Sequence, residues 1–301
     1  MEIKNRSRIC LTISCAIIVI ALVLTIFGHG INLGIDFEGG LSMQYDLKTA
    51  AAKGDVEAVL DGMAVKSYTV TVQGSSDNEI NIRIKDVAQD DIQNIQASFE
   101  ESIHEKYPEA ESIGDVNYVG PVAGATLVRN AIISVLLAAA LMLIYIAIRF
   151  DFNSGVSAVF GLLHDVAIML SFMVIFRSLI QMNSSFIAAA LTIVGYSINN
   201  TIVIFDRIRE NAKRLPTTPR EQVTNLSIRE SLGRTICTTL TTLITIVALC
   251  ILGVASIREF ALPIIVGILS GVYSANMING YVWAWLEEKR LARGNLKAKK
   301  A

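Results

Sequence analysis

Six runs of mostly apolar, uncharged residues divide the sequence and constrain its fold more than any other feature. A helix that crosses the hydrocarbon core of a bilayer needs about 20 such residues. Hydrophobic residues make up 52% of the 301 residues and the mean hydropathy is +0.51, too apolar for one soluble domain. The sequence therefore predicts a polytopic α-helical membrane protein with six transmembrane helices, near Ile9–Gly28, Asn130–Ile148, Gly155–Phe176, Phe186–Phe205, Thr235–Gly253 and Phe260–Leu286.

The charges are distributed unevenly along the chain. Residues 29–125 contain 17 Asp and Glu against 6 Lys and Arg, a balance of −11, and the remainder has a balance of +10. Cytoplasmic segments of membrane proteins carry an excess of Lys and Arg. Both termini and a loop at 206–230 are therefore predicted to be cytoplasmic, with 29–125 outside. Because topology accounts for the basic residues, they do not indicate nucleic-acid binding.

The predicted domains follow from this division: 1–28 with the first helix, 29–125 outside, 126–286 with helices two to six, and the basic tail 287–301. The outer segment has the pattern of a small α+β domain, and its order βαββαβ is that of a ferredoxin-like sandwich. It shows no nucleophile, metal cluster or phosphate loop, so we do not expect an enzyme. The predicted strands are Leu41–Leu47, Lys66–Val72, Glu79–Ile84 and Asp115–Val119, and the predicted helices are Thr49–Met63 and Ala88–Tyr107.

A glycine-rich turn motif follows the first span. Gly34, Gly39 and Gly40 permit tight turns or a close approach of two backbones. Asp36 and Glu38, which lie between these glycines, have the chemistry of metal ligands. Two carboxylates without further oxygen donors are a weak signal, however, and no metal is predicted.

The fourth span carries polar side chains in an apolar helix. Asn199 and Asn200 follow Gly195 and Ser197, and the helix then ends in a charged cytoplasmic motif with Asp206, Arg207 and Arg209. An amide at membrane depth costs free energy unless another helix or a water-filled path satisfies it. The cluster thus indicates either an internal path for ions or contacts that hold helices together.

Ionisable residues occur inside the third span and at the start of the fifth. Asp165 is about ten residues into the third span, about 15 Å deep at 1.5 Å per residue and near mid-bilayer. Asp165 and His164 are candidates to carry a proton, although a static hydrogen bond to a neighbouring helix would also explain them. Arg234 opens the fifth span and either faces a wet path or reaches the surface as an anchor.

The ordered set of these motifs resembles the SecD/SecF family of bacterial protein-export subunits. The resemblance covers nearly the whole chain. It is carried by Gly34–Gly40, Val119–Gly124, Tyr145–Phe150, His164-Asp165, Val194–Asn199, Phe205–Asn211, and Arg234-Thr235 followed by Leu240–Thr242.

The resemblance implies half of a transporter of the resistance-nodulation-division type, paired with a SecD chain in the cell membrane. No cofactor is implied beyond H+ or Na+ as the coupling ion. Entry of that ion would drive the outer domain, which would hold the translocating unfolded polypeptide. The implied partners are SecD, the SecYEG translocon and membrane lipid, with YidC as a further candidate. An efflux half-transporter of the same superfamily and a purely structural translocon subunit remain as alternatives.

One position departs from the family pattern. The family has an acidic residue directly after the Asn of the fourth span, whereas this chain has Asn200. An amide neither takes up a proton nor forms an ion pair with Arg234. Two accounts follow: the SecD partner supplies the carboxylate, with Asn200 and Arg234 as its polar surroundings, or Asp165 or a sodium path serves instead.

Overall fold

The computed structural model describes residues 3–63, 65, 67–73, 78–85, 87–114, 116–178, 180–253 and 255–298. Contacts divide the chain into two compact units. The sheet unit comprises Leu33–Ile132 and the three residues Met182–Ser184. The helical unit comprises Met1–Asn32, Ile133–Gln181 and Ser185–Ala301.

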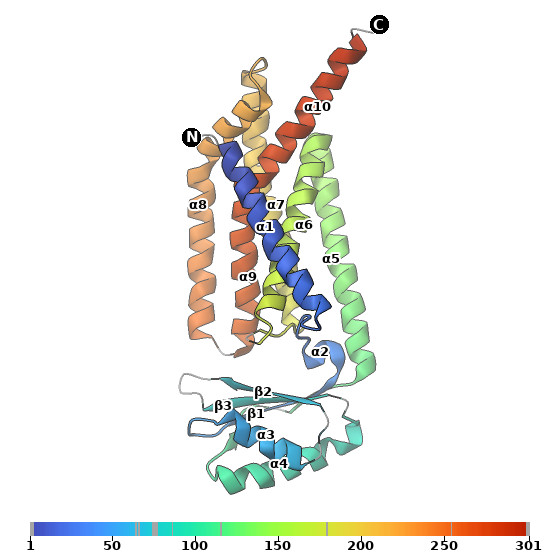
Figure 1. Cartoon of the computed structure of the whole chain (residues 1–301), viewed down its shortest axis with the longest axis vertical. Coiled ribbons are helices and arrows are strands. Elements are labelled where there is room, and N and C mark those ends of the chain that lie inside the picture. The colour runs from blue at the N-terminus through green and yellow to red at the C-terminus, as the bar shows by residue number, and fades with distance from the viewer. Residues whose placement is uncertain are drawn as a thin grey trace. The chain divides into compact units, whose positions relative to one another are not determined.

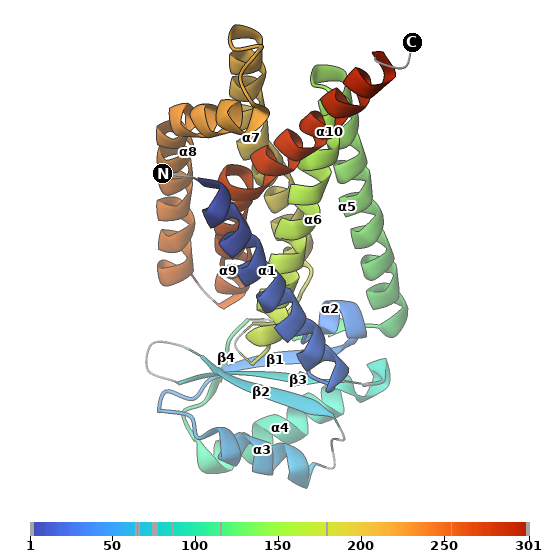
Figure 2. The same cartoon turned by 45° about the horizontal axis from the view of Figure 1, so that its top comes forward.

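The sheet unit is built on an antiparallel sheet with the order β2-β3-β1-β4. The central strand β1 (Gly40–Asp46) pairs with β3 (Glu79–Ile84), and β3 pairs with β2 (Tyr68–Gln73). Two short strands, β4 (Glu111–Ser112) and β5 (Asn117–Val119), share the other side of β1. Figures 1 and 2 show α3 (Lys53–Gly62) and α4 (Ile92–Lys106) side by side on one face of this sheet.

One hydrophobic core joins the sheet to these two helices. Successive side chains of a strand point to opposite faces, so Met43 of β1 and Ile82 of β3 turn inward together. They are almost completely buried, with Leu60 of α3 and with Phe99 and Ile103 of α4. The helices of this unit thus bury one apolar face each, as their sequence pattern predicts.

The elements follow the predicted order, with differences at the ends. The final predicted strand, Asp115–Val119, is found as the shorter β5, and the two-residue β4 precedes it outside the predicted range. Gly114, between the two strands, adopts a φ of +77°. A short 3₁₀ turn, η1 (Gln89–Asp91), precedes α4. Lys66, Asp115 and the turn 74–77, on which parts of the prediction fall, lie outside the described residues.

Gly39 and Gly40 connect the one-turn helix α2 (Ile35–Glu38) to β1. Their φ angles are +82° and +134°, which residues with a Cβ rarely adopt. The Gly39 N–H donates to the Ile35 carbonyl over 2.7 Å and ends the helix. A Cβ on Gly40 would lie 2.4 Å from the carbonyl oxygen of Ile84. The glycine pair therefore allows the chain to turn from α2 directly into the middle of the sheet.

Gly34 and Asp36 hold a distant part of the chain against this turn. The Gly34 N–H donates to the Met182 carbonyl over 2.8 Å, and Asp36 Oδ2 accepts from the Ser184 N–H over 2.7 Å. Met182–Ser184 lies between two membrane spans in the sequence and still belongs to the sheet unit. Glu38 pairs with Lys85. Both carboxylates of the motif are thus engaged in local structure.

Replacing Gly40 with alanine is expected to destabilise the sheet unit by about 2–6 kcal/mol, from backbone strain plus overpacking. The new methyl group would overlap a backbone oxygen of a neighbouring strand. The measurement is thermal unfolding of the purified protein, read out by limited proteolysis of residues in the sheet unit. Gly62→Ala is the control, because a Cβ at Gly62 has no neighbour within 4 Å. Equal stability of both variants would contradict the requirement for glycine at position 40.

A second prediction concerns Tyr68, whose hydroxyl donates to Asp61 Oδ1 over 2.5 Å. This hydrogen bond, together with desolvation, raises the pKa of Tyr68 from 10.0 to about 12. A raised folded-state pKa gives stability that is complete below the unfolded-state value and is lost as the pH rises through the folded value. Ultraviolet difference absorbance should therefore show Tyr68 among the tyrosines that ionise late, together with Tyr45, whose pKa is raised chiefly by burial. Asp61→Asn should lower the pKa of Tyr68 towards its ordinary value, and Tyr68→Phe should reduce the late step by one tyrosine.

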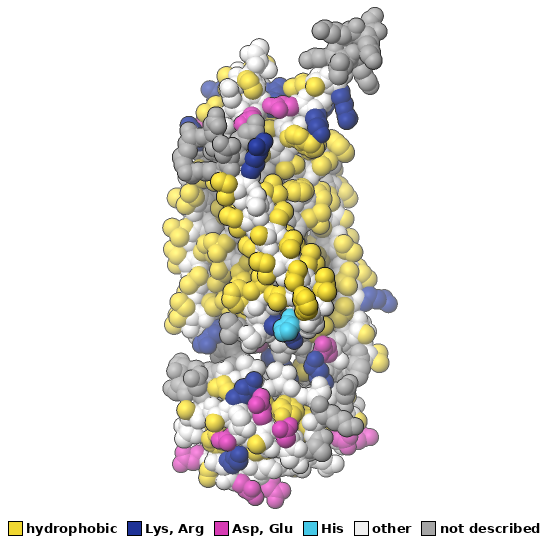
Figure 3. Space-filling model, viewed as in Figure 1, with side chains coloured by type: hydrophobic (Ala, Val, Ile, Leu, Met, Phe, Trp, Pro, Cys, Tyr) yellow, Lys and Arg dark blue, Asp and Glu magenta, His cyan; other side chains and the backbone are white. Residues whose placement is uncertain are grey.

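Six helices long and apolar enough to cross a membrane occur among the described residues, as predicted. Figure 3 shows hydrophobic side chains gathered over the helices on the face in view. The third, fourth and sixth spans form the buried centre, whereas the first, second and fifth are largely exposed. The helices are α1 (Ile3–Ile26), α5 (Pro121–Arg149), α6 (Phe152–Ile175), α7 (Ser185–Arg214), α8 (Arg220–Leu252), α9 (Ala255–Ser274), the π-helical η2 (Ala275–Asn279) and α10 (Gly280–Ala298).

The helices extend further than the sequence predicted. The segment 206–230, expected as a loop, is mostly helical, because α7 continues to Arg214 and α8 begins at Arg220. Ion pairs of Glu210 with Arg207 and Arg214, three and four residues away, support this extension. The second span begins at Pro121 rather than near Asn130, since proline suits the first position of a helix.

Candidate functional site

The carboxylate of Asp165, on α6, is the centre of a buried polar cluster. Its side chain has no exposed surface. Oδ2 accepts hydrogen bonds from Ser197 of α7 over 2.5 Å and from Ser274 of α9 over 2.8 Å. Oδ1 accepts from Ser270 of α9 over 2.7 Å and faces Nδ1 of His164 at 3.0 Å. Both carboxylate oxygens are therefore fully engaged, and the cluster joins three helices.

Two glycines on α9 allow this cluster to form. A Cβ on Gly267 would overlap the Ile193 side chain, and a Cβ on Gly271 would lie 3.3 Å from Cα of Ser197. Small residues four apart bring helix backbones close together in a membrane. Ser270 and Ser274 have the same spacing, so both hydroxyls face Asp165 from one side of α9.

A chain of hydrogen bonds leads from Asp165 to the first helix. His164 Nε2 lies 2.7 Å from the Ser14 hydroxyl of α1. Ser14 donates to the Tyr273 hydroxyl over 3.2 Å, and Tyr273 donates to the Cys10 carbonyl. The Tyr273 and His164 rings stack with centroids 5.9 Å apart. The sequence placed His164 beside Asp165, but it did not indicate the route to α1.

The predicted polar cluster of the fourth span is divided between different faces of α7. Asn200 is buried, and its Nδ2 has no hydrogen-bond partner in the part of the chain that the structure describes. Asn199 is exposed. The Thr201 hydroxyl accepts from Asn279 Nδ2 over 2.9 Å, and Gly161 leaves the room that the Asn279 side chain occupies. The two predicted asparagines therefore do not share one environment.

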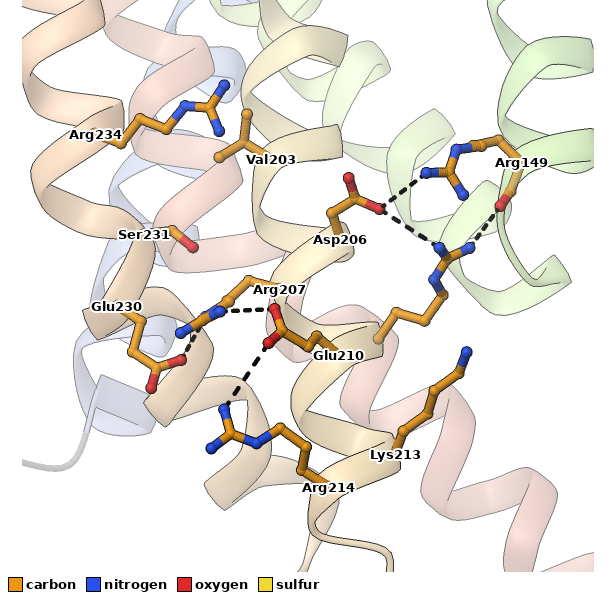
Figure 4. A pocket seen from close by; sticks show the side chains of 11 residues that line it. Arg149, Val203, Asp206, Arg207, Glu210, Lys213, Arg214, Glu230, Ser231 and Arg234 are labelled. Carbon is orange, nitrogen blue, oxygen red and sulfur yellow. Dashed lines mark hydrogen bonds and ion pairs between the residues drawn. The ribbon is translucent and has the colours of Figure 1, made fainter.

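The charged motif at the end of α7 lines a cavity of about 720 Å³ with α5 and α8 (Figure 4). Arg207 pairs with Glu210 and Glu230, each at 2.6 Å. Asp206 lies 3.7 Å from Arg149 and 3.9 Å from Arg209. The complete lining is Arg149, Val203, Asp206, Arg207, Arg209, Glu210, Lys213, Arg214, Glu230, Ser231 and Arg234.

Arg234 belongs to this cavity rather than to the Asp165 cluster. In Figure 4 it extends from α8 towards Val203 of α7. Its side chain is exposed and makes no ion pair within the described ranges. Asn200 is not among the lining residues. The structure thus brings Arg234 together with Asp206, Arg207 and Arg209, and it separates all four from Asp165 and His164.

The sequence offered a static hydrogen bond from a neighbouring helix as one explanation of Asp165, and the structure shows such bonds, but the residues that make them were not identified. Ser197, Ser270 and Ser274 were not identified as partners of the carboxylate, nor Ser14 and Tyr273 as the route from His164 to α1. A usable signal exists only for Ser270 and Ser274, whose spacing of four residues places them on one face of a helix. The remaining contacts depend on how four separate helices pack.

Fold and site define a class: a multi-pass helical membrane protein with an inserted sheet unit and a buried, fully hydrogen-bonded carboxylate among its spans. Residues 98–289 match the family described as "Protein export membrane protein SecD/SecF, C-terminal", and residues 25–51 match the "SecD/SecF GG Motif". The chain belongs to the SecD/SecF family of protein-export membrane proteins.

Similar proteins agree with this assignment. The chain is 36% identical to the protein translocase subunit SecF of Thermodesulfovibrio yellowstonii, over 91% of each chain. It is 34% identical to the protein translocase subunit SecDF of Bacillus subtilis, over 89% of this chain and 36% of that one. The crystal structure of SecDF from Thermus thermophilus superposes with a TM-score of 0.82 at 31% identity. The chain covers 39% of the length of that solved SecDF chain, and 96% of its own length is matched.

Proposed function

We propose that the chain is an accessory subunit of the Sec protein-export machinery that pairs with a SecD chain. The similar proteins are named translocase subunits rather than enzymes. In the SecDF proteins, one chain contains a region that corresponds to this whole chain. That arrangement supports SecD as the partner of this chain. Further expected partners are the SecYEG translocon, YidC, membrane lipid and the unfolded polypeptide in transit.

The observation that carries the mechanism is the burial of Asp165 among four polar partners. A charged group in the membrane interior is costly, and such residues usually mark ion paths or proton relays. The hydroxyls of Ser197, Ser270 and Ser274 engage the carboxylate, and His164 adjoins it. We assign Asp165 the role of the ion-carrying group of this chain, with H+ as the coupling ion.

The choice of H+ over Na+ follows from the hydrogen bonds. A hard cation such as Na+ needs several oxygen lone pairs directed at one point. Here each Asp165 oxygen already has two partners. Oδ1 contacts Ser270 and Nδ1 of His164, and Oδ2 contacts Ser197 and Ser274. A proton, in contrast, fits between Nδ1 of His164 and Oδ1 of Asp165. Sodium-driven export that persists without a proton gradient would count against this choice.

The sheet unit is the proposed moving part. We place it outside the cytoplasm, as a ferredoxin-like domain, with both termini of the chain in the cytoplasm. Its acidic charge and the basic charge of the remainder favour that orientation. One charge that crosses 100 mV supplies about 2.3 kcal/mol, which biases a two-state domain about fiftyfold. This is enough to favour forward movement of a held polypeptide over backward sliding.

The experiment is the secretion kinetics of an exported reporter protein in cells depleted of this chain, with and without an ionophore. Under the proposal, depletion slows the late phase of secretion, and the ionophore adds little further loss. Slow secretion that remains fully sensitive to the ionophore would indicate a structural subunit. Unchanged secretion with greater sensitivity to drugs or lipids would favour an efflux transporter.

A further inference from the structure

The hydrogen-bond chain from Asp165 to α1 has a direction. A tyrosine hydroxyl has one hydrogen, and Tyr273 uses it on the Cys10 carbonyl, so it accepts from Ser14. Ser14 also has one hydrogen, which is then used on Tyr273. The Ser14 oxygen must accept at its contact with His164, so Nε2 of His164 carries a hydrogen. These hydrogen bonds thereby assign a hydrogen to the Nε2 side of the imidazole.

The other side of the imidazole then requires a second proton. Nδ1 of His164 and Oδ1 of Asp165 are 3.0 Å apart, and both would present lone pairs if no hydrogen lay between them. The remaining carboxylate positions are occupied by the hydroxyls of Ser197, Ser270 and Ser274. The pair therefore holds one proton more than a neutral imidazole beside a carboxylate. The structure corresponds to the proton-loaded state of the site.

Loss of that proton reverses the chain. The hydrogen that stays on Nδ1 donates to the Asp165 carboxylate, and Nε2 becomes an acceptor. Ser14 rotates to donate to Nε2, and Tyr273 rotates to donate to Ser14. The loaded network holds four hydrogens, which lie between His164 and Asp165, on Nε2 of His164, on Ser14 and on Tyr273. The network without the proton holds three, and the hydrogen that leaves is the released proton. Tyr273 then has no hydrogen for the Cys10 carbonyl, so one of its two hydrogen bonds to α1 is lost and the other, to Ser14, changes direction.

The packing of α1 makes it sensitive to this contact. Among its described side chains only Ser7, Ser14 and Ala21 are buried, a narrow seam of small residues seven apart. Ser14 supplies the hydrogen bonds in the middle of this seam. Beside Ser14 and Tyr273 lies a mostly apolar cavity of about 290 Å³ between α1, α6 and α9. A shift of α1 into this space displaces little packed material.

We propose that α1 responds to the protonation state of the His164–Asp165 pair through Ser14 and Tyr273. The proposal rests on the function assigned to Asp165 above. It makes Ser14 and Tyr273 positioning residues that couple the site to a helix, not carriers of the ion. After α1 ends at Ile26, the chain enters the sheet unit at Leu33, so a movement of α1 reaches that unit within a few residues.

The test uses the complex with its partner subunit in lipid nanodiscs and two separate readouts. Infrared absorbance of the carboxyl group reports protonation of Asp165. A fluorine NMR label on the exposed Cys15 reports α1, after replacement of Cys10, Cys237 and Cys250 with serine. In the otherwise unchanged protein, both signals should change with the same pH midpoint. Asp165→Asn should abolish both changes.

Tyr273→Phe is the deciding variant, because it removes the hydroxyl and keeps the ring beside His164. We expect the carboxyl signal to titrate still, while the pH response of the Cys15 label falls by about tenfold, a usual size for coupling between sites. Ser14→Ala should act in the same way. Tyr281→Phe, which removes a hydroxyl that contacts Asn225 instead, is the matched control and should leave both signals unchanged.

A Cys15 response that persists in both Tyr273→Phe and Ser14→Ala would overturn the proposal. So would a carboxyl titration in the unchanged protein that the label on α1 does not follow. A different result would contradict the proposed function of Asp165: gradient-driven export at the normal rate when Asp165 is replaced. The two failures are therefore distinguishable.

Discussion

Asp165→Asn is expected to abolish the gradient-dependent part of export while the protein remains in the membrane. An amide keeps the size of the side chain but neither gains nor loses a proton near neutral pH. Loss of one coupled charge removes about 2.3 kcal/mol per 100 mV, which corresponds to an about fiftyfold smaller bias on the moving unit. One amide position would also present N–H groups to hydroxyls that donate to the carboxylate, at a cost of about 1–3 kcal/mol in stability.

The measurement is pulse-chase secretion of a reporter with and without an ionophore, at matched amounts of each variant. Asp151→Asn is the control on the same helix. Asp151 caps the start of α6 by accepting from the Ser154 N–H, and asparagine caps equally well. This control should export at the normal rate. Ionophore-sensitive export by Asp165→Asn at the normal rate would remove Asp165 from the mechanism.

Arg234→Ala should likewise abolish coupled export and leave the protein inserted and folded. The side chain is exposed and has no ion pair within the residues described, so its removal leaves no buried charge unpaired. We expect the bias on the moving unit to fall about fiftyfold, as for Asp165→Asn, because the variant lacks a cation that would balance a charge in transit. Export kinetics with the ionophore control measure this loss, and protease resistance in membranes measures folding.

Lys213→Ala separates a specific role of Arg234 from a general need for positive charge. Lys213 lines the same cavity and is likewise without an ion pair in the described part of the chain. It should export at the normal rate. If Lys213→Ala and Arg234→Ala lose export equally, only the total charge of the cavity matters. If stable Arg234→Ala protein exports normally, Arg234 has no part in coupling.

The sequence was sufficient for the features that depend on short-range pattern. The six spans and the order of elements in the sheet unit follow from hydrophobic periodicity. The helices that occupy most of 206–230 were not predicted in full, because basic and acidic residues mark a membrane boundary whether or not a helix continues through it. The short strand β4 was not predicted, since a two-residue strand leaves no periodic pattern.

The candidate site was predictable only in part, for a related reason. A lone carboxylate in an apolar run is visible in a sequence, and Asp165 was found in this way. Its partners Ser197, Ser270 and Ser274 lie on other helices, and their meeting depends on how those helices pack. The roles of Asn199, Asn200 and Arg234 stay predictions. The structure separates them from Asp165 and leaves room for a contribution from a partner chain.

The small piece Met182–Ser184 has a mechanical consequence. Because it belongs to the sheet unit, the chain passes between the two units four times, at residues 32–33, 132–133, 181–182 and 184–185. A body with a single tether rotates freely and transmits no torque. A body with four tethers transmits a turn to every helix that leaves it. Two of the helices next to these passages, α6 and α7, carry Asp165 and Ser197, so a load on the sheet unit would be passed along the chain to the helices that hold the buried carboxylate.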